Sequence, residues 1–434
     1  MRSDRTIRTL AALACTTLAL ALGSTGAGAQ LAHASASNLA LSDNTTATAR
    51  AFGAISVNPA GLGMPGSGFS LALAPIQGRA GIGPVTLSDL SDFQGIRVPA
   101  LVAEEWLTAI EAAGGQSGST GADVSELALT IGSFGLQLST TASASFTIPS
   151  GVAQAILFGN AGRTGEAADL DLTGLGVDAW AATTGAVSYA FPVGPAMFGA
   201  TGKYTVGHGL AVARATSGSF SSDPIVLSLE SPVIGPCDDG LLGQCTESLG
   251  NNGSGFGMDV GFMMDLPMVR VGASVINVFN TFAWDPATLS YRPGSTLLEQ
   301  GGHDSDFDEI GYDTAPEALR AVVEEYTFKP TLRAGAAMDL PTELTVSADV
   351  HYRLSERAMG VGPRSHLGLG AEWRALRLLH LRAGGALVSG GTQYSGGASL
   401  VLGPVNLSAA AAVLDGETLG RTSLAQFTLS FGNR

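Results

Sequence analysis

The hydrophobic and polar residues of this chain alternate most regularly between Phe328 and Leu354. One alternating run ends at Leu340, a Pro341-Thr342 turn follows, and a second run continues to Leu354. Side chains alternate across a β-strand with a period of two residues, so the pattern predicts two strands joined by a tight turn. Strands of soluble sheets have about 5–6 residues, whereas about 9–11 tilted residues cross a bilayer. The length of these runs therefore predicts a transmembrane hairpin.

The two faces of this hairpin differ in chemistry. We expect the apolar face to contact lipid and the charged face to line the interior of a barrel. The lumen-lining candidates are Arg333, Asp339, Glu343, Asp349, His351 and Arg353. Ser347, Asp349 and His351 could form a catalytic group, because side chains at i and i+2 point the same way. We favour a ladder of opposite charges that neutralise one another inside the wall, each pair contributing about 0.2–1 kcal/mol.

Similar alternation recurs along the chain and predicts one all-β, antiparallel transmembrane barrel. We count about 14 strands, within a range of about 12 to 16, because the region from Ser217 to Gly255 is ambiguous; bacterial barrels have even strand numbers. The last run places Ala425, Phe427, Leu429 and Phe431 on one face. Besides the hairpin, the expected strands lie within residues 69–86, 124–147, 177–191, 195–208, 209–220, 224–229, 256–266, 269–282, 365–373, 378–388, 394–402, 405–413 and 423–431.

The N-terminus has the layout of a secretory signal peptide. Three arginines precede an apolar run over residues 9–22, and small residues follow. The run is shorter than the roughly 20 apolar residues of a membrane-spanning helix. We expect cleavage after Ala29, with cleavage after Ala36 as the alternative. The expected parts are a signal peptide (1–29), an N-terminal segment (30–65) and the barrel (66–434), with the N-terminal segment and short helices in or over the lumen.

Composition supports a membrane barrel. The mean hydropathy is +0.27 and only 14% of the residues are charged, whereas soluble domains have about 25% charged residues. The chain holds 22 lysines and arginines and 37 aspartates and glutamates. Cleavage of the signal segment would remove three arginines and one aspartate, so the mature net charge would be −17. This charge argues against nucleic acids and anionic membrane surfaces as partners. A secreted soluble β protein is the alternative class.

Two inserts between predicted strands differ from the alternating runs. Residues 87–114 have helical spacing with Trp106 and Ile110 on one side, which predicts a helix in the lumen or over an opening. There it would fill space or act as a plug or gate. Residues 284–326 contain an acidic loop and a short helix that begins after Pro316. They do not meet the EF-hand pattern, so we expect a solvated loop, with opportunistic divalent binding as the alternative.

A third insert, residues 231–254, contains Cys237 and Cys245. In an exported protein two loop cysteines are expected to form a disulfide, and two thiols alone do not complete a tetrahedral zinc site. The chain has no Gly-x-Ser-x-Gly elbow, no phosphate-binding Gly-x-x-x-x-Gly-Lys and no His-Glu-x-x-His motif. We therefore expect no enzymatic activity, no catalytic residue, no cofactor and no metal site.

The N-terminal segment carries a resemblance to a known group of proteins. Its Arg50-Ala-Phe-Gly-Ala stretch leads to the motif Asn58, Pro59, Ala60 and Gly61. This order resembles the entry segment of outer-membrane barrels related to FadL, PorV and TraF, and specifically an uncharacterised branch of them. The resemblance continues through motifs in the predicted strands, in the order Gly199–Tyr204, Gly255–Gly261, Val275–Asn280 and His366–Trp373.

The resemblance implies a location in the outer membrane of a Gram-negative-type cell. It implies contact with outer-membrane lipid, and the final strand resembles the signal read by the outer-membrane insertion machinery. As in FadL-like barrels, it implies passage of a hydrophobic small molecule through a plugged lumen. The alternative, as in PorV-like and TraF-like relatives, is a non-transporting partner of a secretion or conjugation apparatus. An apolar groove beside the N-terminal segment would favour transport, and a packed lumen with an exposed apolar loop patch would favour the partner role.

Overall fold

The computed structural model describes residues 31–66, 68–159, 166, 169–222, 225–237, 250–299, 302–355, 359, 362–416 and 420–432. The expected signal peptide therefore lies outside the described residues. The long strands of the chain are β1 (Phe69–Gly83), β2 (Gln116–Ile131), β3 (Phe134–Ile148), β5 (Gly176–Val193), β6 (Ala196–Arg214), β10 (Gly253–Asp265), β11 (Arg270–Asn280), β17 (Thr331–Leu340), β18 (Leu344–Arg353), β19 (Ser365–Leu376), β20 (Leu379–Val388), β21 (Gly391–Leu402), β22 (Val405–Gly416) and β23 (Gly420–Gly432).

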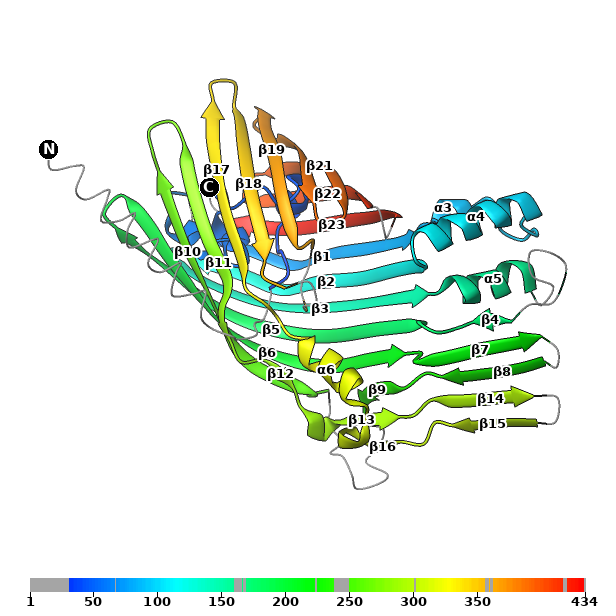
Figure 1. The fold of residues 1–434 in the computed structure, drawn as a ribbon. Helices are drawn as coiled ribbons and strands as arrows, with labels where there is room; N and C mark the ends of the chain where they lie inside the picture. The colour runs from blue at the N-terminus through cyan, green and yellow to red at the C-terminus, as the bar shows by residue number, and fades with distance from the viewer. Residues whose placement is uncertain are drawn as a thin grey trace, which may run out of the picture.

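These strands form a closed antiparallel barrel (Figure 1). Each strand pairs with the next one in this series, and β1 also pairs with the last strand, β23, which closes the sheet. The barrel has 14 strands, so the predicted all-β fold class is confirmed. Closure satisfies the backbone hydrogen bonds of every strand within the sheet, as a lipid environment requires.

The hairpin of β17 and β18 has the predicted orientation. Arg333 pairs with His351 across the two strands, and Ala336 pairs with Ala348. Val350 and Tyr352 point outward and are exposed, whereas Arg333 and Asp349 point inward and are buried. The alternation in the sequence therefore identified the two faces of this hairpin correctly.

Aromatic side chains gather on the outer surface at one end of the barrel. They are Phe69, Phe134, Tyr189, Phe191, Phe198 and Phe262, and neighbouring rings lie 4.6–6.3 Å apart between centroids. Such girdles mark the membrane–water interface of transmembrane barrels. Among the described residues, no helix is both long and apolar enough to span a membrane.

The connections between strands are all short at the aromatic end, whereas most of those at the other end are long. Short turns lie at 132–133, 194–195, 341–343 and 403–404, whereas 84–115, 149–175, 215–252 and 281–330 form long connections. In bacterial barrels the short turns are periplasmic and the long loops extracellular. We assign the two ends of this barrel accordingly.

The long connections carry their own secondary structure (Figure 1). The helices are α3 (Leu87–Ser91), α4 (Ala100–Ala112) and α5 (Ser150–Phe158), and a five-stranded sheet runs in the order β15-β14-β8-β7-β4. Its strands are β4 (Leu170–Asp171), β7 (Ser217–Ser222), β8 (Ile225–Glu230), β14 (Ser295–Glu299) and β15 (Gly302–Asp306). These elements continue beyond the extracellular ends of β1 to β6.

The acidic region at 284–326 is more ordered than we predicted. Its strands are β14, β15, β12 (Ala283–Trp284), β13 (Leu289–Arg292) and β16 (Ile310–Gly311), with the 3-10 helices η4 (Pro286–Thr288) and η5 (Tyr312–Thr314) and the helix α6 (Glu317–Glu325). The short helix after Pro316 is confirmed. Asp304, Asp306 and Asp308 are exposed, as expected for a solvated acidic stretch, but residues 302–306 form the strand β15 and not a loop. β14 pairs with β8, and β13 pairs with β9 (Val233–Pro236). Both partners belong to the connection at 215–252, so no local pattern within 284–326 revealed β13 and β14.

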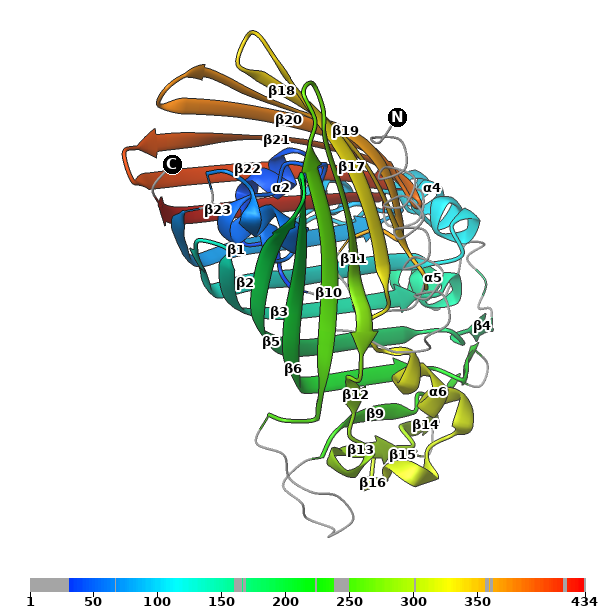
Figure 2. The same cartoon turned by 90° about the vertical axis from the view of Figure 1, so that its left-hand side faces the viewer.

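The N-terminal segment occupies the lumen, as Figure 2 shows for α2. It contains α2 (Ala36–Ala40) and the 3-10 helices η1 (Ala51–Ala54) and η2 (Pro59–Gly63). We call residues 31–66 the hatch. Ala36, Leu39 and Ala40 pack against Ala410 and Ala412 of β22, and most of the hatch is buried. The expectation of an N-terminal segment in the lumen is confirmed.

A second cluster closes part of the extracellular side. Leu319 and Val323 of α6 pack with Phe282, Trp284 and Phe328 from the same connection. The inward-facing Trp180, Leu210 and Val212 of β5 and β6 belong to the same cluster. A short helix therefore lies against the inner wall, but it is α6 and not the predicted helix at 87–114.

The outward position of Leu369 on β19 gives a test of the membrane assignment. Leu369 is 64% exposed and pairs with Ala348 and Gly385 in the middle of its strand. Replacing it by arginine should lower the free energy of unfolding in lipid by about 2–4 kcal/mol, because the charge would lie in hydrocarbon. Leu369→Met is the control. Equal unfolding free energies for the two variants, measured by denaturant titration in vesicles, would contradict a lipid-facing position.

Candidate functional site

The wall binds the hatch mainly through side chains that donate to hatch carbonyls. These bonds come from strands all around the barrel: Gln137 donates to Ala32 at 2.7 Å, Ser274 to Val57 at 2.7 Å, Ser347 to Asn44 at 2.7 Å, Ser395 to Ala40 at 2.9 Å and Gln426 to His33 at 2.6 Å. A buried carbonyl without a partner costs free energy. The small polar residues of the lumen therefore act as partners for the hatch backbone.

The strongest anchors hold the loop between α2 and η1. The Asp349 carboxylate accepts the Thr46 backbone N–H at 2.7 Å. The Arg333 guanidinium donates to the Asp43 carbonyl at 3.1 Å and to the Thr46 hydroxyl at 3.3 Å. We predicted that these charged residues pair with one another as a ladder. The ladder is wrong, because both side chains bind a segment about 300 residues away in sequence.

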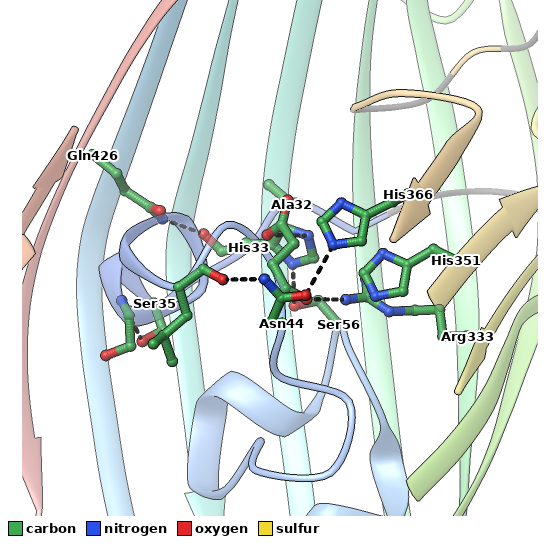
Figure 3. A network of polar contacts seen from close by, with 12 residues as sticks. Ala32, His33, Ser35, Asn44, Ser56, Arg333, His351, His366 and Gln426 are labelled. Atoms are coloured by element: carbon green, nitrogen blue, oxygen red, sulfur yellow. Dashed lines mark hydrogen bonds and ion pairs between the residues drawn. The ribbon is translucent and has the colours of Figure 1, made fainter. Parts of the chain in front are cut away.

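Three histidines meet beside this anchor (Figure 3). His351 lies 3.3 Å from the Asp349 carboxylate, measured from its Nε2, and His366 Nε2 lies 3.1 Å from Asn44 Oδ1. The two wall rings stack with centroids 4.4 Å apart. His33 of the hatch lies 3.7 Å from Asp43. Burial lowers the pKa of His33, and the Asp43 carboxylate acts in the opposite direction.

The remaining lumen-lining candidates have other roles. Arg353 is buried and donates to the Gly362 carbonyl at 2.6 Å, so it holds an extracellular connection. Asp339 lies at the periplasmic rim, where its side chain is 65% exposed and pairs with Arg270 at 2.7 Å. Glu343 lies in the turn between β17 and β18 with a φ of 56° and is exposed. Its predicted lumen-lining position is wrong, because the turn includes one more residue than expected.

The entry-segment motif joins the hatch to the wall. The Asn58 amide donates to the Thr46 carbonyl and to the Phe262 carbonyl of β10, each at 3.0 Å. Its Oδ1 accepts the Ala60 N–H at 3.2 Å, which caps η2, and Pro59 begins that helix. A Cβ at Gly61 would collide with the Ala49 carbonyl. The motif therefore fixes a tight turn inside the hatch.

Glycines in the wall make room for this turn. A Cβ at Gly199 of β6 would collide with the Pro59–Ala60 backbone, and a Cβ at Gly261 of β10 would collide with the Asn58 amide. Other inward glycines also touch the hatch: Gly135, Gly272, Gly335, Gly368, Gly370, Gly384 and Gly397. The glycine-containing strand motifs seen in the sequence thus include the places where the wall and the hatch are in closest contact.

A cavity of about 410 Å³ separates the hatch from one side of the wall. It lies at the periplasmic end, where Arg270, Arg374, His380 and Arg382 face hatch residues that include Arg50. Glu372 also lines it and pairs with Arg374 and Arg382, each at 2.5 Å. Charged and hydroxyl side chains line much of this cavity, beside smaller apolar residues such as Leu41 and Ala49. The cavity is therefore not the apolar groove that we set as the sign of transport.

Exposed apolar side chains lie instead on the extracellular helices. They are Leu87 and Leu90 of α3, Leu101 of α4 and Ile156 of α5, with Ile96 between α3 and α4, and Leu101 is 87% exposed. The predicted plug residues Trp106 and Ile110 belong to the core of this helix layer. Ile110 is buried with Ala153 of α5, and Trp106 contacts the Phe93 ring at a centroid distance of 5.6 Å. The segment that plugs the lumen is the hatch.

The described residues of this site form no metal-binding cluster, and the disulfide of the chain lies elsewhere, in an extracellular connection. No three His, Cys, Asp or Glu residues in the described part of the chain are arranged to hold a metal ion. Cys237 is disulfide-bonded, and Cys245, the partner expected from the sequence, lies outside the described residues. The candidate site is therefore the contact between the hatch and the wall, together with the cavity beside it.

The chain matches the model of a sequence family. The model of a family of unknown function (DUF5723) matches residues 117–407, which is more than half of the chain. No curated protein sequence matches the chain.

Several solved structures are similar to the chain. The toluene transporter TbuX of Ralstonia pickettii is 14% identical with a TM-score of 0.53, over 94% of this chain and 98% of that one. A FadL homologue of Pseudomonas aeruginosa is 10% identical with a TM-score of 0.49, over 93% and 99%. The toluene transporter TodX of Pseudomonas putida is 12% identical with a TM-score of 0.46, over 94% and 98%. At this identity the likeness to TbuX concerns the fold.

Two glycines of β6 provide a matched test of the docking surface. Gly199 faces the hatch, whereas an added Cβ at Gly202 meets nothing within 4 Å. Gly199→Ala should therefore displace the hatch and destabilise its docking by about 1–3 kcal/mol, the usual cost of overpacking. Gly202→Ala should not. The measurement is the rate of trypsin cleavage after Arg50 in the folded barrel, and equal rates for both variants would contradict the described packing.

Proposed function

This chain belongs to the family of unknown function DUF5723, and we propose that it passes hydrophobic small molecules across the outer membrane through a barrel that its own hatch closes. The observation that carries this proposal is that the plug is a separate segment, which is held in the lumen largely by hydrogen bonds. The barrel closes on itself through β1 and β23, so its backbone pairing does not depend on the hatch. The hatch is held largely by hydrogen bonds to small polar and charged wall residues such as Ser347 and Asp349.

A polar interface suits a plug that moves. Hydrogen bonds contribute about 0.5–1.5 kcal/mol each, because water replaces a partner that leaves. Apolar area, in contrast, costs about 25 cal/mol per Å² when it becomes exposed. Displacing the hatch would wet serines, glutamines, glycines and charged groups of the wall, and it would also separate the apolar clusters that join hatch residues such as Leu39 and Leu62 to wall alanines. The polar part of this interface can exchange its partners for water while the barrel stays intact.

The extracellular helices supply an apolar surface at the start of this path. Leu101 and Ile156 are exposed on α4 and α5, and Leu87 and Leu90 are exposed on α3. Exposed apolar surface of this kind marks ligand or partner sites. The fold shared with TbuX, which is named a toluene transporter, also supports hydrophobic solutes.

The second candidate is a non-transporting partner of a secretion or conjugation apparatus. The tight packing of the hatch and the polar cavity favour it, as does the apolar patch on the extracellular helices, which could bind protein. In this case the exposed leucines of α3 and α4 would serve a partner and not a solute. The two candidates differ in whether anything crosses the barrel.

Uptake into vesicles separates the two candidates. The full chain and a chain lacking residues 30–64 are reconstituted into vesicles with a lipopolysaccharide outer leaflet, and entry of a fluorescent hydrophobic probe is compared with entry of polar and charged probes of similar size. The full chain should admit the hydrophobic probe fastest, and the deletion should admit all probes, because the lumen is then open.

The outcomes of this experiment have distinct meanings. No entry above that of protein-free vesicles, with either chain, would support the partner role. Equal entry of all probes through the full chain would indicate a general porin. Heat-modifiable gel migration of both chains is the control, because it reports whether the barrel is folded.

A further inference from the structure

We propose that His351 and His366 form a proton-sensitive latch, and that protonation of both rings releases the hatch and opens the lumen at acid pH. The inference concerns the hatch itself and does not depend on which solute crosses the barrel. It rests on three features of the cluster shown in Figure 3: the stacking of the two rings, their contacts with the anchors of the hatch, and the charges around them.

The two rings are a directly opposed cross-strand pair. His351 of β18 faces His366 of β19 in the strand register. Their centroids are 4.4 Å apart and their planes differ by 9°, and both residues are buried. Two imidazole rings stack in this way when at most one of them is charged. Protonation of both would place two positive charges in contact in a buried site.

Each ring also touches a group that holds the hatch. His351 contacts Asp349, whose carboxylate accepts the Thr46 N–H. His366 contacts the side chain of Asn44, and the Asn44 carbonyl accepts the Ser347 hydroxyl. A movement of either ring therefore changes a contact of the loop between α2 and η1. No other pair of described histidines has this position.

The surrounding charges set how many protons the docked cluster tolerates. The titratable and charged groups that face the two rings come from the hatch, β17 and β18: His33, Asp43, Arg333 and Asp349. With neutral imidazoles the nearest charges are Arg333 and the carboxylates of Asp43 and Asp349, so one proton can be balanced. A second proton leaves excess positive charge beside Arg333, and the dry docked state disfavours it.

The direction of the pH effect follows from this difference. With the hatch undocked, water reaches both rings, and they take up protons near the ordinary imidazole pKa of about 6.5. The undocked state therefore binds more protons than the docked state. By linkage, docking is stable above this pH and weakens as the pH falls, by up to about tenfold per pH unit for each additional proton.

The periplasmic cavity brings water close to the cluster. Thr45 and Ser347 line the cavity, and Ser347 contacts Asn44 directly. Protons from the periplasmic side therefore need to pass only one layer of side chains to reach His366. The cavity that was too polar to be a groove for apolar solutes fits this role.

Ion conductance across planar bilayers tests the latch with the full-length protein. Lowering the pH from 7.5 to 5.0 should raise the open probability at least tenfold. The double variant His351→Gln/His366→Gln keeps side chains that can hydrogen-bond to Asp349 and Asn44, but these side chains cannot bind protons. It should therefore lose most of this response. His208→Gln is the matched control, because His208 lies on the exposed side of β6 with Thr183 and should keep the full response.

A second measurement protects the test against a misfolded double variant. Ser42 of the hatch is fully buried, and Ser42→Cys is a near-isosteric reporter in a chain with both histidines. Its labelling by a charged thiol reagent should accelerate at pH 5.0 relative to the exposed reference Ser88→Cys, which corrects for the thiolate fraction. Absence of both the conductance rise and the relative labelling rise would overturn the proposal, as would a full response in the double variant. Conductance reports opening even if no hydrophobic solute is transported, so the two proposals fail separately.

Discussion

The structure depends on how two charges in the barrel wall are satisfied. Arg333 and Asp349 are buried inside the barrel, and a buried charge left without a partner costs about 3–5 kcal/mol. Both bind the hatch, Arg333 through the Asp43 carbonyl and Asp349 through the Thr46 N–H. The loop that provides these groups has Ser42 and Asp43 in the left-handed region, with φ values of 47° and 60°. Such conformations cost roughly 1–3 kcal/mol and persist where surrounding contacts determine them.

The rest of the lumen follows from this arrangement. A chain that lies against a β-wall needs close approach and partners for its backbone. Glycines such as Gly199 and Gly261 provide the approach, and short polar side chains such as Ser274 and Ser395 provide the partners. An apolar lumen would have fixed the hatch by burial, and a more highly charged lumen would have required a more charged hatch. The observed interface combines these polar contacts with small apolar clusters, such as that of Leu39 with Ala410, and so holds the hatch in one place.

The sequence was sufficient for the barrel because strand alternation is local. The lipid face of β17 and β18, the inward position of Asp349 and the final strand with Phe427 outward all follow from a period of two. The partners of those inward residues were not predictable in the same way. Asp349 binds Thr46 across 303 positions of sequence, and no alternation encodes that contact. The ladder between wall charges was the nearest local solution, and the hatch displaced it.

Other errors have the same physical origin. His366 was passed over because it stands alone in a glycine-rich run, and only its register with His351 gives it a neighbour. β14 and β15 were taken for a loop because adjacent Leu297 and Leu298 hide the alternation, and β8 supplies the pairing from a distant connection. The helix with Trp106 was recognised, but its apolar side packs on α5. Element type could be read locally, whereas the contacts between elements could not.

The two ends of the barrel differ in a way that constrains any path through it. The extracellular helices expose leucines and isoleucines, and the periplasmic cavity is lined by arginines, a glutamate and hydroxyl groups. A hydrophobic solute held on the helices gains about 25 cal/mol per Å² of buried apolar area. It loses this gain on entering the polar cavity, which therefore does not retain it. In the transport that we propose, movement toward the periplasm would then depend on how often the hatch leaves the lumen, and the contacts of Asp349 and Asn44 would set that frequency.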